Sequence, residues 1–399
     1  MSESRPVKVR LVILWLVISL PALIFPGCGE EAGIPQVEEP SHAASASEST
    51  PESEVSSGAG ESFPSYESSI FSLADAYSDY FLLGTIYTPK TLSDPEKSLV
   101  LGNFNCITPE NIMKPEYMQP TEGNFNFTES DTMMQFAGEN NLKVVGHTIV
   151  WHQQSGDWLG RNVTREEAIE QLRNHITSIV GRYRGKVLSW DVVNEAVDDG
   201  KSLPADGDWT KCLRETQWLS SIGPDYIALA FTFAHEADPD AKLYYNDYNL
   251  NDSKKAEVVC AMVRDLKSQG VPIDGIGMQG HYTTNVSVAS VERSLKMFSE
   301  LGVEVSISEL DVAVNDAAGA KSLTREQEIR QAVTYAKLFK VFKKYSDLIK
   351  RVTFWGTVDS ASWRSDRFPC LFNGDYTPKE AVYAVLDPEK YLSDIEKEE

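Results

Sequence analysis

From about residue 66 onward, eight short apolar segments alternate with longer segments of helical periodicity, and no other feature restricts the possible folds as strongly. Neighbouring parallel strands must be joined by crossover connections, which are usually helices. Eight such strand-then-helix units within about 330 residues suit a closed barrel. The strand candidates are residues 81–86, 104–108, 143–147, 187–193, 241–246, 273–279, 304–308 and 351–355. The sequence therefore predicts an α/β fold, a (β/α)8 TIM barrel over residues 66–393.

Several intervening segments carry explicit signals for helix ends. Thr164 with Glu167, and Thr324 with Gln327, have the spacing of a capping box at a helix start. Gly270 is a natural residue just beyond a helix end. An open doubly wound sheet is the alternative fold, but no glycine-rich nucleotide loop follows the first strand candidate. The signals predict helices over residues 164–183, 253–269 and from 324 towards 345.

Two of the strand candidates lead directly to a glutamate. Residues 187–193 run through Asn194 to Glu195, and residues 303–308 run to Glu309. Largely apolar runs of this kind are typical of buried parallel strands, and barrel active sites form where the strands end. A retaining glycosidase needs two carboxyl groups there, one as acid/base and one as nucleophile. The alternative is that both glutamates only satisfy hydrogen bonds at the barrel rim.

The other predicted strand ends also carry polar or aromatic side chains. Three of the six histidines, His147, His152 and His281, occupy such positions, and metal ligation is one interpretation of them. No HExxH or similar ligand spacing accompanies them, so we expect no metal and no cofactor. The cysteines of the body show no CxxC pattern and are expected to be mostly free, buried thiols. They are Cys106, Cys212, Cys260 and Cys370.

Seven motifs in register across residues 66 to about 390 closely resemble the family 10 glycoside hydrolases, the endo-1,4-β-xylanases. They are TPENIMK (108–114), GHTIVWH (146–152), WDVVNE (190–195), YNDYN (245–249), GIGMQGH (275–281), SELD (308–311) and FWG (354–356) with SW (362–363). The resemblance implies a retaining endo-1,4-β-xylanase that hydrolyses internal bonds of xylan through a covalent glycosyl-enzyme. It implies Glu195 as acid/base and Glu309 as nucleophile.

The same resemblance implies a set of substrate-binding residues. Asn194 matches the residue that bonds the sugar 2-hydroxyl. Gln279 and His281 are expected on the same side of one strand, with His281 placed to orient the nucleophile. Tryptophans at rim positions offer flat faces to sugar rings, whereas Trp190, Trp209 and Trp218 are expected to be packing residues; His152 has no clear partner. Glu110, Asn111 and Lys114 resemble the family's residues that bind hydroxyls on the glycone side. The full binding set is Glu110, Asn111, Lys114, His147, Trp151, Asn194, Gln279, His281, Trp355 and Trp363.

Three departures from the family pattern leave the fine specificity open. Pro115 stands where the family usually has tryptophan, residues 153–158 differ from the usual proline-containing loop, and Ser308 replaces a threonine. Two alternatives therefore remain: a mixed xylanase/β-1,4-glucanase, and a non-catalytic cell-surface glycan-binding protein. The net charge of −22 argues against a nucleic-acid partner, because binding phosphates needs clustered lysine and arginine. We expect a monomer acting on xylan or xylo-oligosaccharides.

The first 65 residues differ in kind from the barrel. A basic segment and the apolar run 11–26 are typical of a signal peptide over residues 1–27. Gly27 and Cys28 resemble a bacterial lipobox, although Phe25 departs from it, so we expect lipidation of Cys28; ordinary secretion and an uncleaved anchor are the alternatives. Residues 28–65 have the composition of a flexible Ser/Glu-rich linker, and residues 394–399 that of a charged tail. This predicts an exported lipoprotein at the cell envelope.

Overall fold

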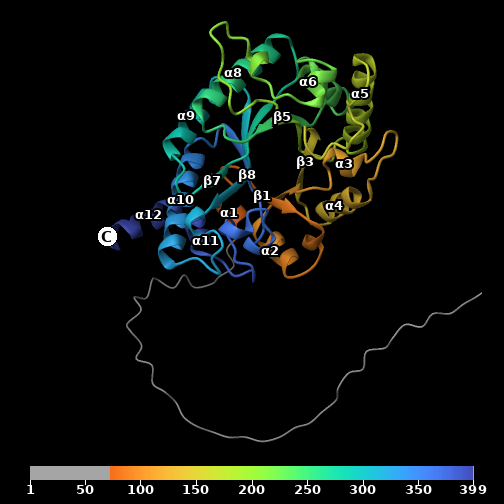
Figure 1. Cartoon of the computed structure of the whole chain (residues 1–399). Coiled ribbons are helices and arrows are strands. Elements are labelled where there is room, and N and C mark those ends of the chain that lie inside the picture. Colours follow the sequence, from red (N-terminus) through yellow and green to blue (C-terminus); the bar gives the residue numbers. More distant parts are fainter. Residues whose placement is uncertain (1–71, 399) are drawn as a thin grey trace, which may run out of the picture. The chain divides into compact units, whose positions relative to one another are not determined.

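The computed structural model describes residues 72–398, in which eight parallel strands close into a barrel surrounded by helices (Figure 1). β1 pairs with β2 on one side and with β9 on the other, and β6 pairs directly with β8, which completes the ring. The short β7 pairs with β8 beyond that ring. The strands are β1 (Leu82–Tyr87), β2 (Cys106–Pro109), β3 (Lys143–Val150), β4 (Ser189–Asn194), β5 (Lys242–Asp247), β6 (Gly275–Met278), β7 (His281–Thr283), β8 (Glu304–Ala313) and β9 (Ile349–Phe354).

The helices follow the strands in chain order and cover the outside of the barrel (Figure 1). The α-helices are α1 (Leu73–Ala76), α2 (Glu96–Asn103), α3 (Pro115–Met118), α4 (Thr128–Glu139), α5 (Arg165–Arg182), α6 (Gln217–Ser221), α7 (Tyr226–Ala237), α8 (Ser253–Ser268), α9 (Val288–Ser299), α10 (Arg325–Lys344), α11 (Glu380–Leu386) and α12 (Pro388–Glu398). Short 3-10 turns are η1 (Pro89–Leu92), η2 (Trp209–Cys212), η3 (Asn315–Ala317), η4 (Asp359–Ala361) and η5 (Ser365–Arg367).

The structure confirms the barrel and both predicted capping boxes. The Thr164 hydroxyl accepts the Glu167 N–H at the start of α5, and Thr324 accepts the Gln327 N–H at the start of α10. Each helix therefore begins where its side chains replace missing backbone partners. The four cysteines of the barrel are free and buried, as predicted.

One predicted strand is interrupted. The expectation that Gln279 and His281 share one strand is wrong, because β6 ends at Met278 and His281 begins β7. Gly280 lies between them with φ +84°, a conformation that favours glycine. The chain turns there, so His281 pairs with Asp311 of β8 instead of continuing β6.

Two glycines make room for large buried side chains of neighbouring strands. Trp190 of β4 is fully buried against Gly146 of β3, where a Cβ atom would lie 2.0 Å from the indole ring. Tyr244 of β5 similarly occupies the space beside Gly275, whose Cβ would lie 2.3 Å from the tyrosine ring. These contacts set the packing of the strands that end at the site. As expected, Trp190 and also Trp209 and Trp218 are buried packing residues.

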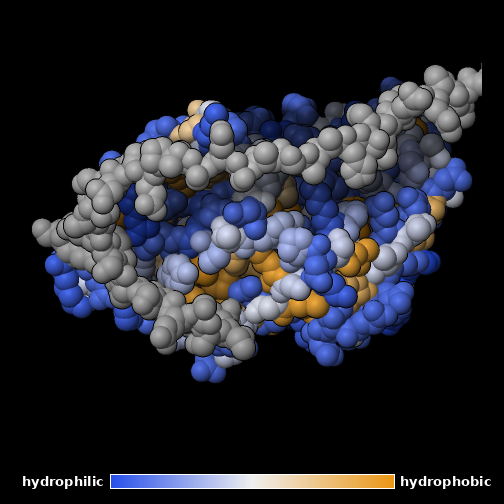
Figure 2. All heavy atoms as spheres, turned by 90° about the horizontal axis from the view of Figure 1, so that it is seen from below, coloured by the Kyte–Doolittle hydropathy of each residue, from blue (hydrophilic) through white to orange (hydrophobic). Residues whose placement is uncertain are grey.

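Predicted features at the two ends of the chain lie outside or at the edge of the described residues. The predicted signal peptide, Cys28 and the linker up to residue 65 lie outside the described residues. The expected boundary at residues 393/394 falls within α12. In the described part, no helix combines the length and hydrophobicity that a membrane crossing requires. Seen from below the view of Figure 1, the surface has hydrophilic residues around its edge and apolar residues gathered near its middle (Figure 2).

Candidate active site

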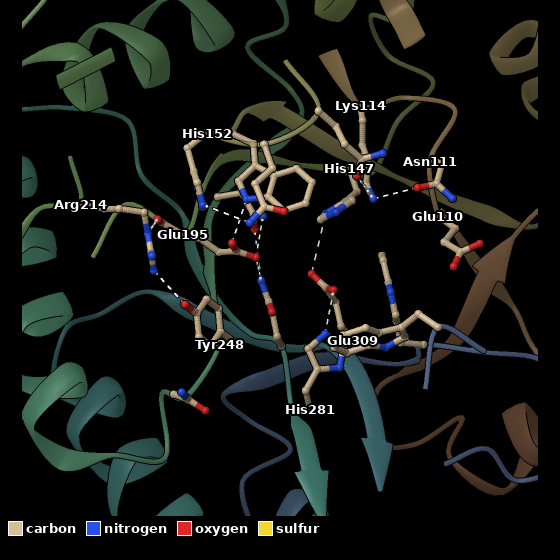
Figure 3. Close-up of a pocket in the computed structure, with 18 residues that line it drawn as sticks. Glu110, Asn111, Lys114, His147, His152, Glu195, Arg214, Tyr248, His281 and Glu309 are labelled. Atoms are coloured by element: carbon tan, nitrogen blue, oxygen red, sulfur yellow. Dashed lines mark hydrogen bonds and ion pairs between the residues drawn. The ribbon is translucent and has the colours of Figure 1, made fainter. Parts of the chain in front are cut away.

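A cleft of about 600 Å³ lies at the carboxyl ends of the barrel strands. Its walls include both candidate catalytic glutamates and every predicted substrate-binding residue. Glu195 and Glu309 lie in its central part, with Arg214 and Tyr248 towards one end and Lys114 towards the other (Figure 3). The fold therefore brings together residues that the sequence separates by up to about 250 positions, as expected of a barrel rim.

The backbone at Glu195 is held in an unusual conformation. Glu195 follows β4 with φ +57°, in the left-handed region that non-glycine residues rarely occupy. The Tyr245 hydroxyl accepts the N–H groups of Ala196 and Val197, each at 3.1 Å. Arg214 donates through Nε to the Glu195 carbonyl at 3.1 Å and through Nη2 to the Val197 carbonyl at 3.3 Å. Tyr245 and Arg214 thus stabilise a backbone conformation that would otherwise cost conformational free energy.

A buried charged network supports Tyr245 in turn. Its hydroxyl donates to Asp247 Oδ2 at 2.5 Å, and Lys255 Nζ donates to Asp247 Oδ1 at 2.8 Å. Burial raises the pKa of Asp247 to about 6, although Lys255 and the Tyr245 hydroxyl oppose that shift. Lys255 also contacts Asp199 at 2.6 Å, in the loop after β4. The position of the Tyr245 hydroxyl is therefore fixed by groups outside the cleft.

The carboxyl group of Glu195 accepts hydrogen bonds from uncharged donors. Trp151 Nε1 donates to Oε2 at 2.8 Å, whereas Gln279 Nε2 and Asn194 Nδ2 donate to Oε1 at 2.9 and 3.2 Å. Glu195 is 9% exposed, so one edge of the group still faces the cleft. Residues at the ends of β3, β4 and β6 therefore orient the carboxyl group, and none of these contacts is an ion pair.

Glu309 is surrounded differently. Asn246 Nδ2 donates to its Oε1 at 2.7 Å and His281 Nε2 to its Oε2 at 3.2 Å, while His147 Nδ1 lies 4.0 Å from Oε1. Asp311 Oδ2 contacts His281 Nδ1 at 3.0 Å. The carboxylate is thus bounded by the Asn246 amide and by two imidazoles, His147 and His281, which are labelled in Figure 3.

These contacts determine the charges around Glu309. Burial alone would lower the pKa of His281, but Asp311 and Glu309 outweigh it and raise that pKa from 6.5 to about 10. Burial would raise the pKa of Glu309, but the imidazoles of His147 and His281 and the Asn246 amide lower it overall. Glu309 is therefore ionised beside a protonated His281 at neutral pH, as a nucleophile requires.

Two asparagines connect the glutamates. Asn246 Nδ2 donates to Asn194 Oδ1 at 2.8 Å as well as to Glu309, and Asn194 Nδ2 contacts Glu195. The Ser308 hydroxyl donates to Asn246 Oδ1 at 2.5 Å, which fixes the orientation of the amide. The departure to serine at position 308 therefore keeps a hydroxyl donor where one is needed.

The end of the cleft near β2 contains a buried lysine. Lys114 Nζ donates to Asn111 Oδ1 and Gln154 Oε1, both at 2.8 Å, and lies 5.1 Å from the Trp151 ring centre. Burial lowers the pKa of Lys114, although Glu309 and Glu110 oppose this. Burial raises the pKa of Glu110, which Lys114 opposes in turn. This end therefore offers several directed donors and acceptors suited to sugar hydroxyls.

The remaining predicted residues form the cleft floor and one exposed wall. His147 is held through Nδ1 by Asp191 at 3.0 Å and contacts Trp355 edge-to-face at 5.2 Å. Trp363 is 60% exposed, and its Nε1 donates to Asp311 at 3.0 Å. A large exposed indole fixed by one hydrogen bond presents a ready face to a sugar ring.

Several residues that line the cleft or hold its lining residues were not predicted as site residues. Gln154 lies in the loop recognised only as a departure, and Asp311 was quoted in a motif without a role. Arg214 comes from the irregular segment between β4 and α6, where no periodicity signals its position. Tyr248 and Asn249 follow β5 in the YNDYN motif, so the strand-end rule would have found them. His152, left without a clear partner, also lines the cleft, and burial lowers its pKa.

Within residues 72–398, no cluster of histidine, cysteine or acidic side chains has an arrangement suited to a metal ion. The chemistry that the site can perform rests on its two carboxyl groups. One is ionised and fixed, and the other is contacted by neutral donors at the cleft surface.

Comparison with known proteins gives consistent results. The family model described as glycosyl hydrolase family 10 matches residues 72–388. Endo-1,4-beta-xylanase A of Caldicellulosiruptor sp. (strain Rt8B.4) is 38% identical over 82% of this chain and 49% of its own length. Beta-1,4-xylanase of Dictyoglomus thermophilum is 39% identical over 79% of this chain and 90% of its own length.

A solved structure is similar as well. A variant of an intracellular xylanase from Thermoanaerobacterium saccharolyticum, in complex with xylotriose, is 37% identical with a TM-score of 0.73, covering 78% of this chain and 97% of that one. The chain spans about half the length, or less, of the longer relatives that it matches.

Proposed function

The chain belongs to glycosyl hydrolase family 10, and on that premise we propose that it is a retaining endo-1,4-β-xylanase acting as a monomer. The observation that carries the proposal is the pair of carboxyl groups in one cleft, one just after β4 and one within β8. Glu309 is paired with His281, whereas Glu195 is contacted by neutral donors in the same cleft. The names of the relatives and the xylotriose complex of a similar structure support xylan as the substrate.

The first step forms a glycosyl-enzyme. A Glu309 oxygen attacks the anomeric carbon, the glycosidic C–O bond breaks, and the leaving oxygen takes the proton of the Glu195 carboxyl group. Asn194 is placed beside both the acid and Asn246, where it can hold the sugar 2-hydroxyl as positive charge develops on the ring. The products of this step are a Glu309 ester, an ionised Glu195 and the released sugar.

The second step reverses the roles. The ionised Glu195 takes a proton from water as the water oxygen attacks the anomeric carbon, and the bond to Glu309 breaks. Glu309 is released as a carboxylate beside His281, which stabilises its charge. Two inversions leave the product with the β-configuration of the substrate.

Proton NMR of early xylan hydrolysis tests this mechanism. We expect the β-anomer to appear first and to mutarotate later. The Glu309→Ala protein serves as the control for contaminating activity. Initial α-anomer would contradict the assignment of Glu309 as a nucleophile.

Substrate choice requires a separate measurement. Initial rates on xylan, mixed-linkage glucan and aryl cellobioside should show kcat/KM highest for xylan. Comparable values on glucan would instead identify a mixed xylanase/β-1,4-glucanase. Binding of xylan without any hydrolysis would identify a glycan-binding protein.

We further propose that the protein is exported and anchored to a membrane by lipid on Cys28. The support is the basic and apolar leader, the Gly27–Cys28 pair and the Ser/Glu-rich composition of residues 28–65. Wild type should fractionate with membranes, and Cys28→Ala should move to the soluble fraction. Membrane retention of Cys28→Ala would favour an uncleaved anchor.

A further inference from the structure

A second hollow opens beside the active-site cleft, and we refer to it as the α3 groove. It has a volume of about 780 Å³, within the range of about 300–1,000 Å³ typical of small-ligand sites. One wall is formed by α3 and the residues just after it, and the other by residues 154–161 after β3.

The Gln154 side chain separates the α3 groove from the active-site cleft. It lines both hollows. Its Oε1 accepts from Lys114 in the cleft at 2.8 Å, and its Nε2 donates to Glu116 Oε1 on the groove side at 3.3 Å. The groove therefore adjoins the end of the cleft that contains Lys114, the end that the family resemblance assigns to the glycone, with the Gln154 side chain between them.

The walls of the groove are tied together before any ligand binds. The Glu116 N–H donates to the Gln154 carbonyl at 2.8 Å, and Trp158 Nε1 donates to the Gln119 carbonyl at 3.3 Å. Ser155 accepts from Gln217 of α6 at 2.9 Å. A preformed site loses less conformational freedom on binding than a flexible one.

The groove also presents an aromatic ring to solvent. Among the described residues, the large aromatic side chains that are most exposed are Trp363 at 60%, Tyr117 at 42% and Tyr80 at 38%. Trp363 belongs to the cleft, and the Tyr80 ring is covered by Lys343 Nζ at 5.0 Å. Tyr117 lies in the α3 groove. An exposed ring in a hollow beside a carbohydrate site suits the apolar face of a sugar.

The charged groups of the groove favour a neutral ligand. Two carboxyl groups, Glu116 and Asp157, outnumber the one guanidinium, Arg161, so an acidic sugar would meet net repulsion. In the described part of the chain, Glu116 accepts from Gln154 Nε2 at 3.3 Å, and Arg161 donates through Nε to the Gly156 carbonyl at 3.3 Å. A mixture of donors and acceptors around a ring matches a hydroxyl-rich neutral molecule.

We propose that the α3 groove binds a neutral pentose unit of the substrate. This pentose is joined to the part of the xylan that is held at the glycone end of the cleft. This inference rests on the proposed function and adds a substrate contact to it. The pentose can come from two sources, a further xylose of the backbone or an arabinofuranosyl branch.

Steady-state kinetics of Tyr117→Ala test the proposal with three substrates: an aryl β-xylobioside, linear xylohexaose and an arabinofuranosyl-substituted xylo-oligosaccharide. We expect kcat/KM to be unchanged for the aryl xylobioside, which is too short to reach the groove. A loss of about fivefold, equivalent to about 1 kcal/mol, on linear xylohexaose identifies a backbone xylose. A loss confined to the substituted substrate identifies the branch.

Two variants control for trivial effects. Tyr80→Ala removes a surface tyrosine of similar exposure outside the groove and should change none of the three values. Tyr117→Phe keeps the ring and should retain most of the wild-type kcat/KM. Equal values for Tyr117→Ala and Tyr80→Ala on both longer substrates would overturn the proposal, as would an equal loss on the aryl xylobioside.

Binding measurements separate this inference from the proposed function. Calorimetric titration of the Glu309→Ala protein with the same two oligosaccharides needs no turnover. Weaker binding of either oligosaccharide after adding Tyr117→Ala supports binding in the α3 groove, even if the wild type does not hydrolyse xylan. A failure to hydrolyse xylan would count against the proposed function alone. Unchanged affinity for both oligosaccharides would overturn the groove proposal.

Discussion

Glu195 and Glu309 lie at the same end of one barrel, yet they are held differently. Side chains hold the backbone around Glu195 and its carboxyl group accepts only from uncharged donors, whereas the carboxylate of Glu309 is bound by a histidine and an amide. At Glu195, Tyr245 and Arg214 bind the backbone groups around a left-handed residue. Glu309 lies within β8, where the register against β9 shifts between Ile307 and Leu310, and His281 and Asn246 bind its side chain directly.

The difference follows the chemistry that each residue performs. A nucleophile must be ionised whenever substrate arrives, so a protonated histidine beside it is useful throughout. An acid/base must give and retake a proton in one turnover, and a cation bonded to its carboxyl group would oppose that exchange. Arg214 donates to the carbonyl of Glu195 and leaves the carboxyl group to neutral donors.

The largest expected effect is that of Glu309→Ala. Without the nucleophile no glycosyl-enzyme forms, and kcat/KM on xylan should fall by roughly 10⁵-fold. If azide restores any turnover, it should give the α-glycosyl azide, because only one inversion occurs. A variant that retains near-wild-type activity on xylan would rule out this residue as the nucleophile.

Glu195→Ala should show a smaller loss that depends on the substrate. Xylan needs a proton on its leaving oxygen, and its kcat/KM should fall by about 10²–10⁴-fold. An aryl xyloside with a good leaving group should form the glycosyl-enzyme at nearly the wild-type rate, and azide should release it as the β-glycosyl azide. Equal losses for both kinds of leaving group would remove the distinction between the two glutamates.

His281→Gln tests the ion pair at Glu309 through stability. The pKa of His281 is raised from 6.5 to about 10 in the folded protein, so its contribution is complete below pH 6.5 and disappears as the pH rises through 10. Chemical denaturation should therefore find the variant less stable by about 2 kcal/mol at pH 6, from the loss of charged hydrogen bonds. The difference from wild type should shrink towards pH 10.

His152→Gln is the matched control for this pH effect. Burial lowers the pKa of His152, so it carries no stabilising charge between pH 6.5 and 10. Its stability difference from wild type should stay level over that interval. A difference for His281→Gln that also stays level would contradict the protonated state assigned to His281.

The strand-end rule found Glu195 and Glu309 because both follow apolar runs, and the barrel follows from the repetition of such runs. It failed where the chain departs from regular periodicity. Gly280 breaks the strand before His281, and Arg214 reaches the site from an irregular loop. The contact between Tyr245 and the backbone after Glu195 depends on the register of β4 against β5, which a single sequence does not reveal.

Tyr245→Phe should lower kcat/KM less than either glutamate substitution, and it should affect the function of Glu195 alone. It leaves the N–H groups of Ala196 and Val197 without their acceptor, which costs about 1–3 kcal/mol of stability. Because the backbone of Glu195 is then less restrained, kcat/KM on xylan should fall by about tenfold. The formation of glycosyl-enzyme from a substrate with a good leaving group should be unchanged, because Glu309 keeps all its contacts.

Tyr244→Phe provides the comparison that decides the meaning of that result. Tyr244 is the preceding residue of β5, is also buried, and donates to Glu304 Oε2 at 2.7 Å without touching the segment after Glu195. Both variants should be less stable, as measured by thermal unfolding. Only Tyr245→Phe should lower kcat/KM, and the loss should be larger for substrates with a more basic leaving group. The same leaving-group dependence in Tyr244→Phe would show that general loosening of β5, and not the Tyr245 hydroxyl, controls the acid/base.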